Sequence, residues 1–128
     1  MLKLTYTENG FRLERLSLPL EAWIAQRVSL TLCAGQTLYI EPSQASFLLP
    51  ARDSGLFRLE QILDAEHRSF IGLSIVDEDF TEVSLKGSWI AERVNAHEGI
   101  FVAAFASQVE FYLYKLWHAT QAQASFLA

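Results

Sequence analysis

The chain has 128 residues, of which 51% are hydrophobic and 20% are charged, and its formal net charge is −5. This length fits a single domain over residues 1–128 that folds without disulfides or bound metal. The ten basic residues are scattered along the sequence. That argues against nucleic-acid and membrane-surface partners, because both require clustered basic side chains.

The single cysteine, Cys33, excludes an intrachain disulfide and suits a reducing compartment. Its apolar neighbours predict a buried, unreactive side chain. The first residues lack the pattern of a signal peptide, and the longest apolar runs span about seven residues, short of the ~20 that a membrane helix needs. We therefore expect a cytoplasmic protein.

Residues 2–16 predict a β-hairpin. Leu2, Leu4 and Tyr6 alternate with polar residues, and segment 11–16 alternates in the same way. Between them, Glu8-Asn9-Gly10 contains Asn-Gly, the strongest short hairpin signal, because both residues tolerate positive φ.

Residues 19–34 fit a helix better than a strand. Pro19 suits a first helical turn and Gly35 a C-terminal stop. However, residues 28–32 also alternate like a strand and include β-branched side chains, so a strand is the alternative. The length favours the helix. Its expected inward face consists of Leu20, Trp23, Ile24, Arg27, Val28 and Thr31.

Shorter elements follow. Residues 37–41 and 45–49 predict two short strands around Pro42-Ser43-Gln44, closed by Pro50. The spacing of Leu56, Leu59, Ile62 and Leu63 predicts a short helix that ends near Glu66.

Residues 69–76, 81–91 and 99–106 predict three strands of an antiparallel meander. In the middle strand Val83, Leu85 and Trp89 face one way and polar residues face the other, so one side is solvated. Residues 100–106 have no polar face. We expect that strand to be covered on both sides.

Residues 107–123 predict the final helix. Its inward stripe is formed by Val109, Tyr112, Leu113, Leu116 and Trp117. Phe111, Tyr114 and His118 lie on roughly the opposite side. Exposed aromatic residues are typical interface anchors, so we predict that these three bind a second copy or a protein partner. The alternative is that the hairpin or Phe126-Leu127 covers them.

Local catalytic, phosphate-binding and cofactor motifs are missing from the sequence, and we expect no cofactor. A distributed site is the alternative. His67 precedes the first strand of the meander and His97-Glu98 follow the second, which predicts that they meet at one end of the sheet. Two histidines and a carboxylate suit zinc or iron. His67, His97 and Glu98 are therefore candidate ligands of a metal- or small-molecule-binding protein, a class that includes enzymes.

Segments 41–50 (EPSQASFLLP), 99–102 (GIFV) and 113–117 (LYKLW) resemble those of a family of small cyanobacterial proteins of unknown function. The resemblance extends over most of the chain, implies a soluble cytoplasmic protein and brings no catalytic residues. Separately, the expected element order after the hairpin, α-β-β-α-β-β-β-α, is similar to that of roadblock-type dimerisation modules. Such modules typically pair and serve as scaffolds, but the extra hairpin departs from their pattern.

The predicted fold class is α+β, an antiparallel sheet with helices mainly on one face and a C-terminal helix over residues 100–106. The alternative is a β-barrel or sandwich that the C-terminal helix closes. The leading functional hypothesis is a non-enzymatic interaction module that self-associates or binds a protein partner, because the chain carries more apolar side chains than an average soluble domain.

Overall fold

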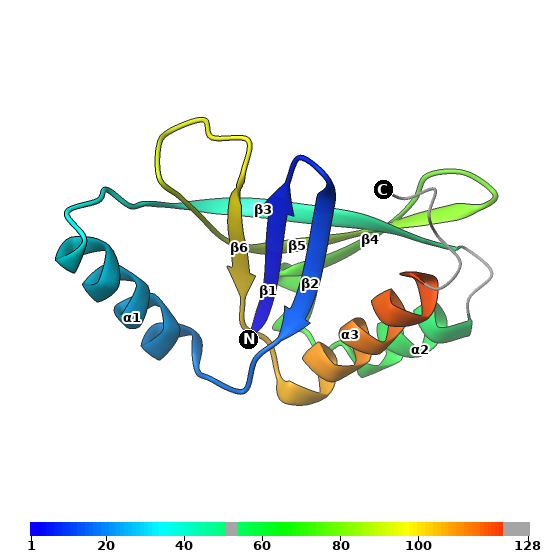
Figure 1. Ribbon diagram of the computed structural model, residues 1–128. Helices are drawn as coiled ribbons and strands as arrows, with labels where there is room; N and C mark the ends of the chain where they lie inside the picture. Colours follow the sequence, from blue (N-terminus) through cyan, green and yellow to red (C-terminus); the bar gives the residue numbers. More distant parts are fainter. Residues whose placement is uncertain (51–53, 122–128) are drawn as a thin grey trace.

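A computed structural model describes residues 1–50 and 54–121 of the chain (Figure 1). It confirms the α+β class, because the antiparallel sheet is open rather than closed into a barrel. In chain order the elements are β1 (Leu2–Thr7), β2 (Gly10–Arg15), α1 (Leu20–Cys33), β3 (Tyr39–Pro50), α2 (Ser54–Ile62), the 3-10 helix η1 (His67–Ser69), β4 (Ile71–Ile75), β5 (Phe80–Ala91), β6 (Gly99–Ala103) and α3 (Ser107–Gln121).

The N-terminal hairpin is confirmed and forms part of the sheet. Strands β1 and β2 pair along their whole length, with Leu2 opposite Arg15 at one end and Thr7 opposite Gly10 at the other. The other edge of β1 pairs with β6, where Leu4 lies opposite Phe101. The hairpin therefore extends the sheet, and the strand order along it is β2-β1-β6-β5-β3.

Strand β5 organises the second half of the sheet. One of its edges pairs with β3 over its whole length. Its other edge is shared, because β4 pairs with residues 81–85 and β6 with residues 88–90. The expected pairs of the meander are thus present, but the expected arrangement is wrong. The strands β4 and β6 lie on the same edge of β5, because β3 occupies the other.

Residues 39–50 form one continuous strand, so the two short strands expected around Pro42-Ser43-Gln44 are a wrong prediction. Pro42 lies opposite Ser88, in the middle of the pairing with β5. Proline has no N–H and is tolerated in a strand at a sheet edge, where that N–H would face solvent. Strand β3 is such an edge strand, so Pro42 does not end it.

The predicted helix over residues 19–34 is confirmed as α1, which Pro19 precedes as the N-cap residue. Its inward face is also as expected: Trp23 is buried, and the other five residues assigned to that face are partly buried. Cys33 lies outside this face and is exposed. The prediction of a buried cysteine was therefore wrong.

The end of α1 is a Schellman motif. Gly35 adopts φ +70°, and its N–H donates to the carbonyl of Leu32 at 3.1 Å. The next N–H, of Gln36, donates to the carbonyl of Thr31 at 3.0 Å. These two bonds satisfy carbonyls that the helix end would otherwise leave unpaired, and they turn the chain towards β3.

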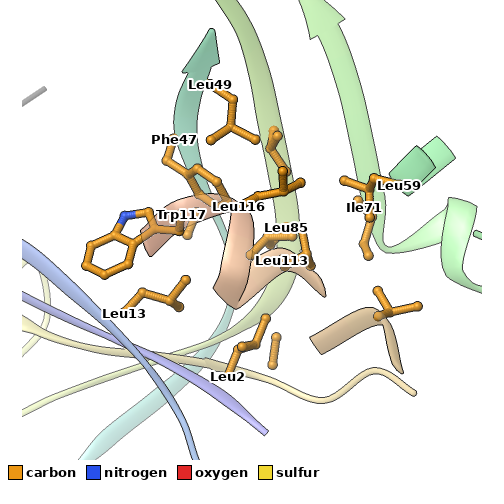
Figure 2. Packing of buried hydrophobic residues seen from close by; sticks show 14 of the residues in the cluster. Leu2, Leu13, Phe47, Leu49, Leu59, Ile71, Leu85, Leu113, Leu116 and Trp117 are labelled. Atoms are coloured by element: carbon orange, nitrogen blue, oxygen red, sulfur yellow. The ribbon is translucent and has the colours of Figure 1, made fainter. Parts of the chain in front are cut away.

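Two hydrophobic clusters lie on opposite faces of the sheet. The larger one joins the sheet to α2 and α3, and Figure 2 shows part of it. It includes Phe101 and Ala103 of β6. The smaller one joins the sheet to α1 and consists of Met1, Trp23, Ile90 and Val102. Because β6 contributes to both clusters, the expectation that this strand is covered on both sides is confirmed.

Some boundaries differ from the expected ones. Helix α2 ends at Ile62, earlier than Glu66, because Asp64 accepts the N–H of His67 at 2.8 Å and starts a new 3-10 turn. Strand β6 ends at Ala103. Since β3 is a single strand, the element order after the hairpin is α-β-α-β-β-β-α, and the similarity to roadblock-type modules does not hold.

Candidate functional site

The core side of α3 is fixed by its predicted inward stripe. Val109, Leu113, Leu116 and Trp117 are buried, and Tyr112 is partly buried. The Tyr112 hydroxyl donates a hydrogen bond of 3.0 Å to the carbonyl of Gly55 in α2. The two helices therefore pack side by side, and the opposite side of α3 faces outwards.

A buried ion pair holds the first turn of α3 against the hairpin. The α-amino group of Met1 lies 2.8 Å from Glu110 Oε1, and the exposed fractions of the two side chains are 0% and 5%. The same amino group donates a hydrogen bond of 2.8 Å to the carbonyl of Leu16. Sequence reasoning missed this pair, because no local pattern links two residues so far apart.

The three residues predicted to bind a partner lie in different environments. The Phe111 side chain is 51% exposed. Its ring centroid is 5.8 Å from Cζ of Arg15 on β2 and 5.4 Å from Nζ of Lys115. The hairpin thus contributes a cation beside this ring but leaves half of the side chain in solvent.

Tyr114 and His118 form a separate pair, one helical turn apart. Tyr114 is partly buried against the larger cluster, whereas His118 is exposed. Their rings meet edge-on with centroids 4.4 Å apart, and Nε2 of His118 is 2.7 Å from the Tyr114 hydroxyl. Phe126 and Leu127, the other expected cover for this surface, lie outside the described residues.

Both ring nitrogens of His67 are engaged. Nδ1 lies 2.6 Å from Asp64 Oδ1, and Nε2 accepts the backbone N–H of Ala106 at 3.0 Å. The N–H of Ala106 requires an unprotonated Nε2, so this geometry assigns the proton to Nδ1. Hydrogen bonds from the backbone N–H and then the ring of His67 lower the pKa of Asp64.

The structure does not bring His67 together with His97 and Glu98. His67 connects the start of β4 to the segment that follows β6. His97 and Glu98 lie in the loop between β5 and β6, where Glu98 Oε1 accepts the N–H of Glu8 at 3.2 Å. The separation follows from the shared edge of β5, since β4 begins opposite Leu85 and β6 pairs near Ile90. Within residues 1–50 and 54–121, no group of three or more His, Cys, Asp or Glu side chains could hold a metal ion.

His97 and Glu98 instead line a groove of about 920 Å³ between α1, β1 and the loop after β5. Arg27 and Thr31 of α1 form part of the opposite wall. The Arg27 guanidinium lies 4.9 Å from the Trp23 ring centroid, which restrains it by a cation–π contact. Acidic, basic and hydroxyl groups therefore line one hollow together with the apolar side chains of Leu38, Ile90 and Ile100.

A further feature that sequence reasoning missed is the outer edge of β3. A signal for it was present, because a proline within a strand indicates an edge position. Pro42 was instead interpreted as part of a turn.

Residues 1–121 match the Alr0857-like family. The chain belongs to this family. The match confirms the resemblance to a family of small proteins, and it covers every element from β1 to α3. No curated protein and no solved structure matches the chain. Among the helices of this Alr0857-like chain, none in residues 1–50 and 54–121 is long and apolar enough to cross a membrane.

Proposed function

We propose that this chain of the Alr0857-like family is a non-enzymatic interaction module that self-associates or binds a protein partner through an apolar surface that includes α3. The observation that carries the proposal is the setting of Phe111. Its ring is half exposed and lies close to the cationic groups of Arg15 and Lys115. Aromatic side chains held in place beside arginine are typical anchors of protein interfaces.

The amount of exposed apolar surface also supports association. Among the described residues, ten large hydrophobic side chains have exposed fractions between 43% and 82%. Several lie near the end of α1 and the start of β3 and belong to neither cluster. Association would remove part of this surface from water. The ten are Leu30, Leu32, Tyr39, Ile40, Phe57, Phe70, Ile75, Val76, Val94 and Phe111.

We also propose that the module works in the cytoplasm. Cys33 is an exposed free cysteine, and exposed free thiols persist best where the compartment is reducing.

Sedimentation velocity over a concentration series, together with a pull-down that uses the purified chain as bait, tests the proposal. Phe111→Ser should weaken association about tenfold or more, because it removes the aromatic anchor. Phe57→Ser is the matched control, since Phe57 is also a helical phenylalanine and is 66% exposed. A chain that sediments as a monomer at every concentration and captures no partner would contradict the proposal. Equal effects of both substitutions would argue against the α3 surface.

A further inference from the structure

Among residues 1–50 and 54–121, no strand lies beside the outer edge of β3, which leaves a row of backbone groups there. Strand β3 ends the order β2-β1-β6-β5-β3 and follows the border of the sheet (Figure 1). Its inner edge pairs with β5 from Tyr39 to Pro50. An unpaired edge of this length is a template for another strand, and proteins usually restrict it.

The prolines show which residues face outwards. Pro42 lies opposite Ser88 and cannot donate to β5, so this pair is of the non-hydrogen-bonded kind, in which both residues direct their backbone groups away from each other. The partner strand gives independent support. Lys86, the partner of Gln44, donates its N–H to Phe70 at 2.8 Å, on the far side of β5.

Because the pattern alternates, Gln44, Ser46 and Leu48 share this outward orientation. Among the described residues, none accepts a hydrogen bond from the N–H of these three. The carbonyl of Gln44 accepts a 3.5 Å hydrogen bond from the Ser43 hydroxyl. The free ladder thus consists of three N–H donors and their carbonyls between Pro42 and Pro50.

We propose that the β3 edges of two copies of this chain pair antiparallel around a two-fold axis at Ser46, which joins the two sheets into one. This inference goes beyond the proposed function, because it places self-association at the β3 edge and not at the α3 surface. Pro42 and Pro50 are equidistant from Ser46 in sequence. The pairing therefore places Gln44 opposite Leu48 of the second copy. It also places Pro42 opposite Pro50 of the second copy, so the two residues that lack an N–H face each other.

In this register every outward N–H meets a carbonyl, and the prolines end the ladder on both sides. The residues between the prolines are uncharged, so like charges do not oppose each other across the axis.

Charges on the neighbouring strand complement this register. On β5, Lys86 lies opposite Gln44 and Glu82 opposite Leu48. Across the interface, Lys86 and Gln44 of one copy are thus followed by Leu48 and Glu82 of the second copy on neighbouring strands. Three strand spacings of ~4.8 Å separate Lys86 from that Glu82, about 14 Å in all. The arrangement is weakly attractive and self-complementary, as a two-fold interface requires. A second copy is thus a partner of matching hydrogen-bond pattern and charge.

Sedimentation equilibrium of Ser46→Pro and Ser46→Ala tests this pairing. Ser46→Pro removes the central donor from each copy and should weaken the dimer about 30-fold or more, as expected for two lost hydrogen bonds. Ser46→Ala loses the hydroxyl but keeps the N–H, so it should retain the dimer. Circular dichroism verifies that both variants fold.

Oxidative cross-linking in a Cys33→Ser background is a second measurement, which does not depend on the proline variant. Ser46→Cys should form a disulfide-linked dimer, because paired Cα atoms lie about 5.5 Å apart. Gln44→Cys should not, because its partner is Leu48. Cross-linking of both variants alike would overturn the register.

A wild-type dimer that Ser46→Pro leaves intact but Phe111→Ser dissociates would overturn the pairing and support the α3 surface. A chain that remains monomeric at high concentration would also overturn the pairing, and the proposed function would then rest on its pull-down.

Discussion

Replacement of Glu110 by glutamine tests whether the buried ion pair with the Met1 amino group stabilises the fold. The substitution keeps the size of the side chain and removes its charge, so the amino group stays buried without a counter-ion. Breaking a buried ion pair in this way costs about 3–5 kcal/mol of unfolding free energy. That is a large fraction of the ~5–15 kcal/mol that typically stabilises a domain, and for a chain of this length it lowers the melting temperature by roughly 10–20 °C.

Glu14→Gln is the matched control. Glu14 Oε1 lies 2.6 Å from Arg12 Nη2, but the exposed fractions of the two side chains are 29% and 73%. An exposed pair of this kind contributes about 1 kcal/mol or less. Urea unfolding followed by circular dichroism, on chains whose Met1 amino group is free, gives both free energies. If Glu110→Gln costs no more than Glu14→Gln, the ion pair does not stabilise the fold and the reasoning is refuted.

Four further substitutions have expected outcomes that thermal or urea unfolding can check. Gly87→Ala should lower the free energy of unfolding by about 3 kcal/mol or more, because the new Cβ collides with the backbone of β6. Gly72→Ala is its control and should leave the free energy of unfolding nearly unchanged, because the new Cβ would lie 3.7 Å from its nearest atom. Gly35→Ala should cost about 1 kcal/mol, since φ +70° is unfavourable for alanine; no loss would contradict the role of this residue in the Schellman motif. The backbone N–H and ring of His67 lower the pKa of Asp64 in the folded chain. Its carboxylate therefore stabilises the fold at a pH above 3.8, the pKa of the group in the unfolded chain, and this stabilisation is lost as the pH falls through the lower pKa of the folded chain. Asp64→Asn should therefore be less stable than wild type at neutral pH, and the difference between their melting temperatures should shrink below pH 3.8; a constant difference would contradict this linkage.

Local patterns were sufficient to predict the hairpin, α1 and the core side of α3. Each depends on contacts within a short segment. The turn at Glu8-Asn9-Gly10 sets the pairing of its own two strands, and the spacing of Trp23 with its neighbours places them on one helical face. The double coverage of β6 was also predictable, because a strand without a polar face cannot lie against water.

The candidate metal site depended on long-range pairing, which no local pattern supplies. Its premise was that β4, β5 and β6 follow one another across the sheet. In the structure β3 pairs with the whole of one edge of β5, so β4 and β6 share the other edge of β5. This arrangement separates His67 from His97. The ion pair of Glu110 was missed for the same reason, because it joins two ends of the sequence.

The wrong prediction for residues 39–50 and the proposed interface have one physical cause. Pro42-Ser43-Gln44 was interpreted as a turn between two strands, but the only pairing that proline forgoes is the one through its missing N–H. That loss matters only if the N–H would point at the neighbour. When two prolines in one strand are separated by an even number of positions, as Pro42 and Pro50 are, both missing donors can face the same edge. The strand then pairs fully on its other side, and the residues midway between the prolines keep the outward donors. Proline spacing within a strand therefore indicates which edge is open, and Ser46 is the position where a single proline would close it.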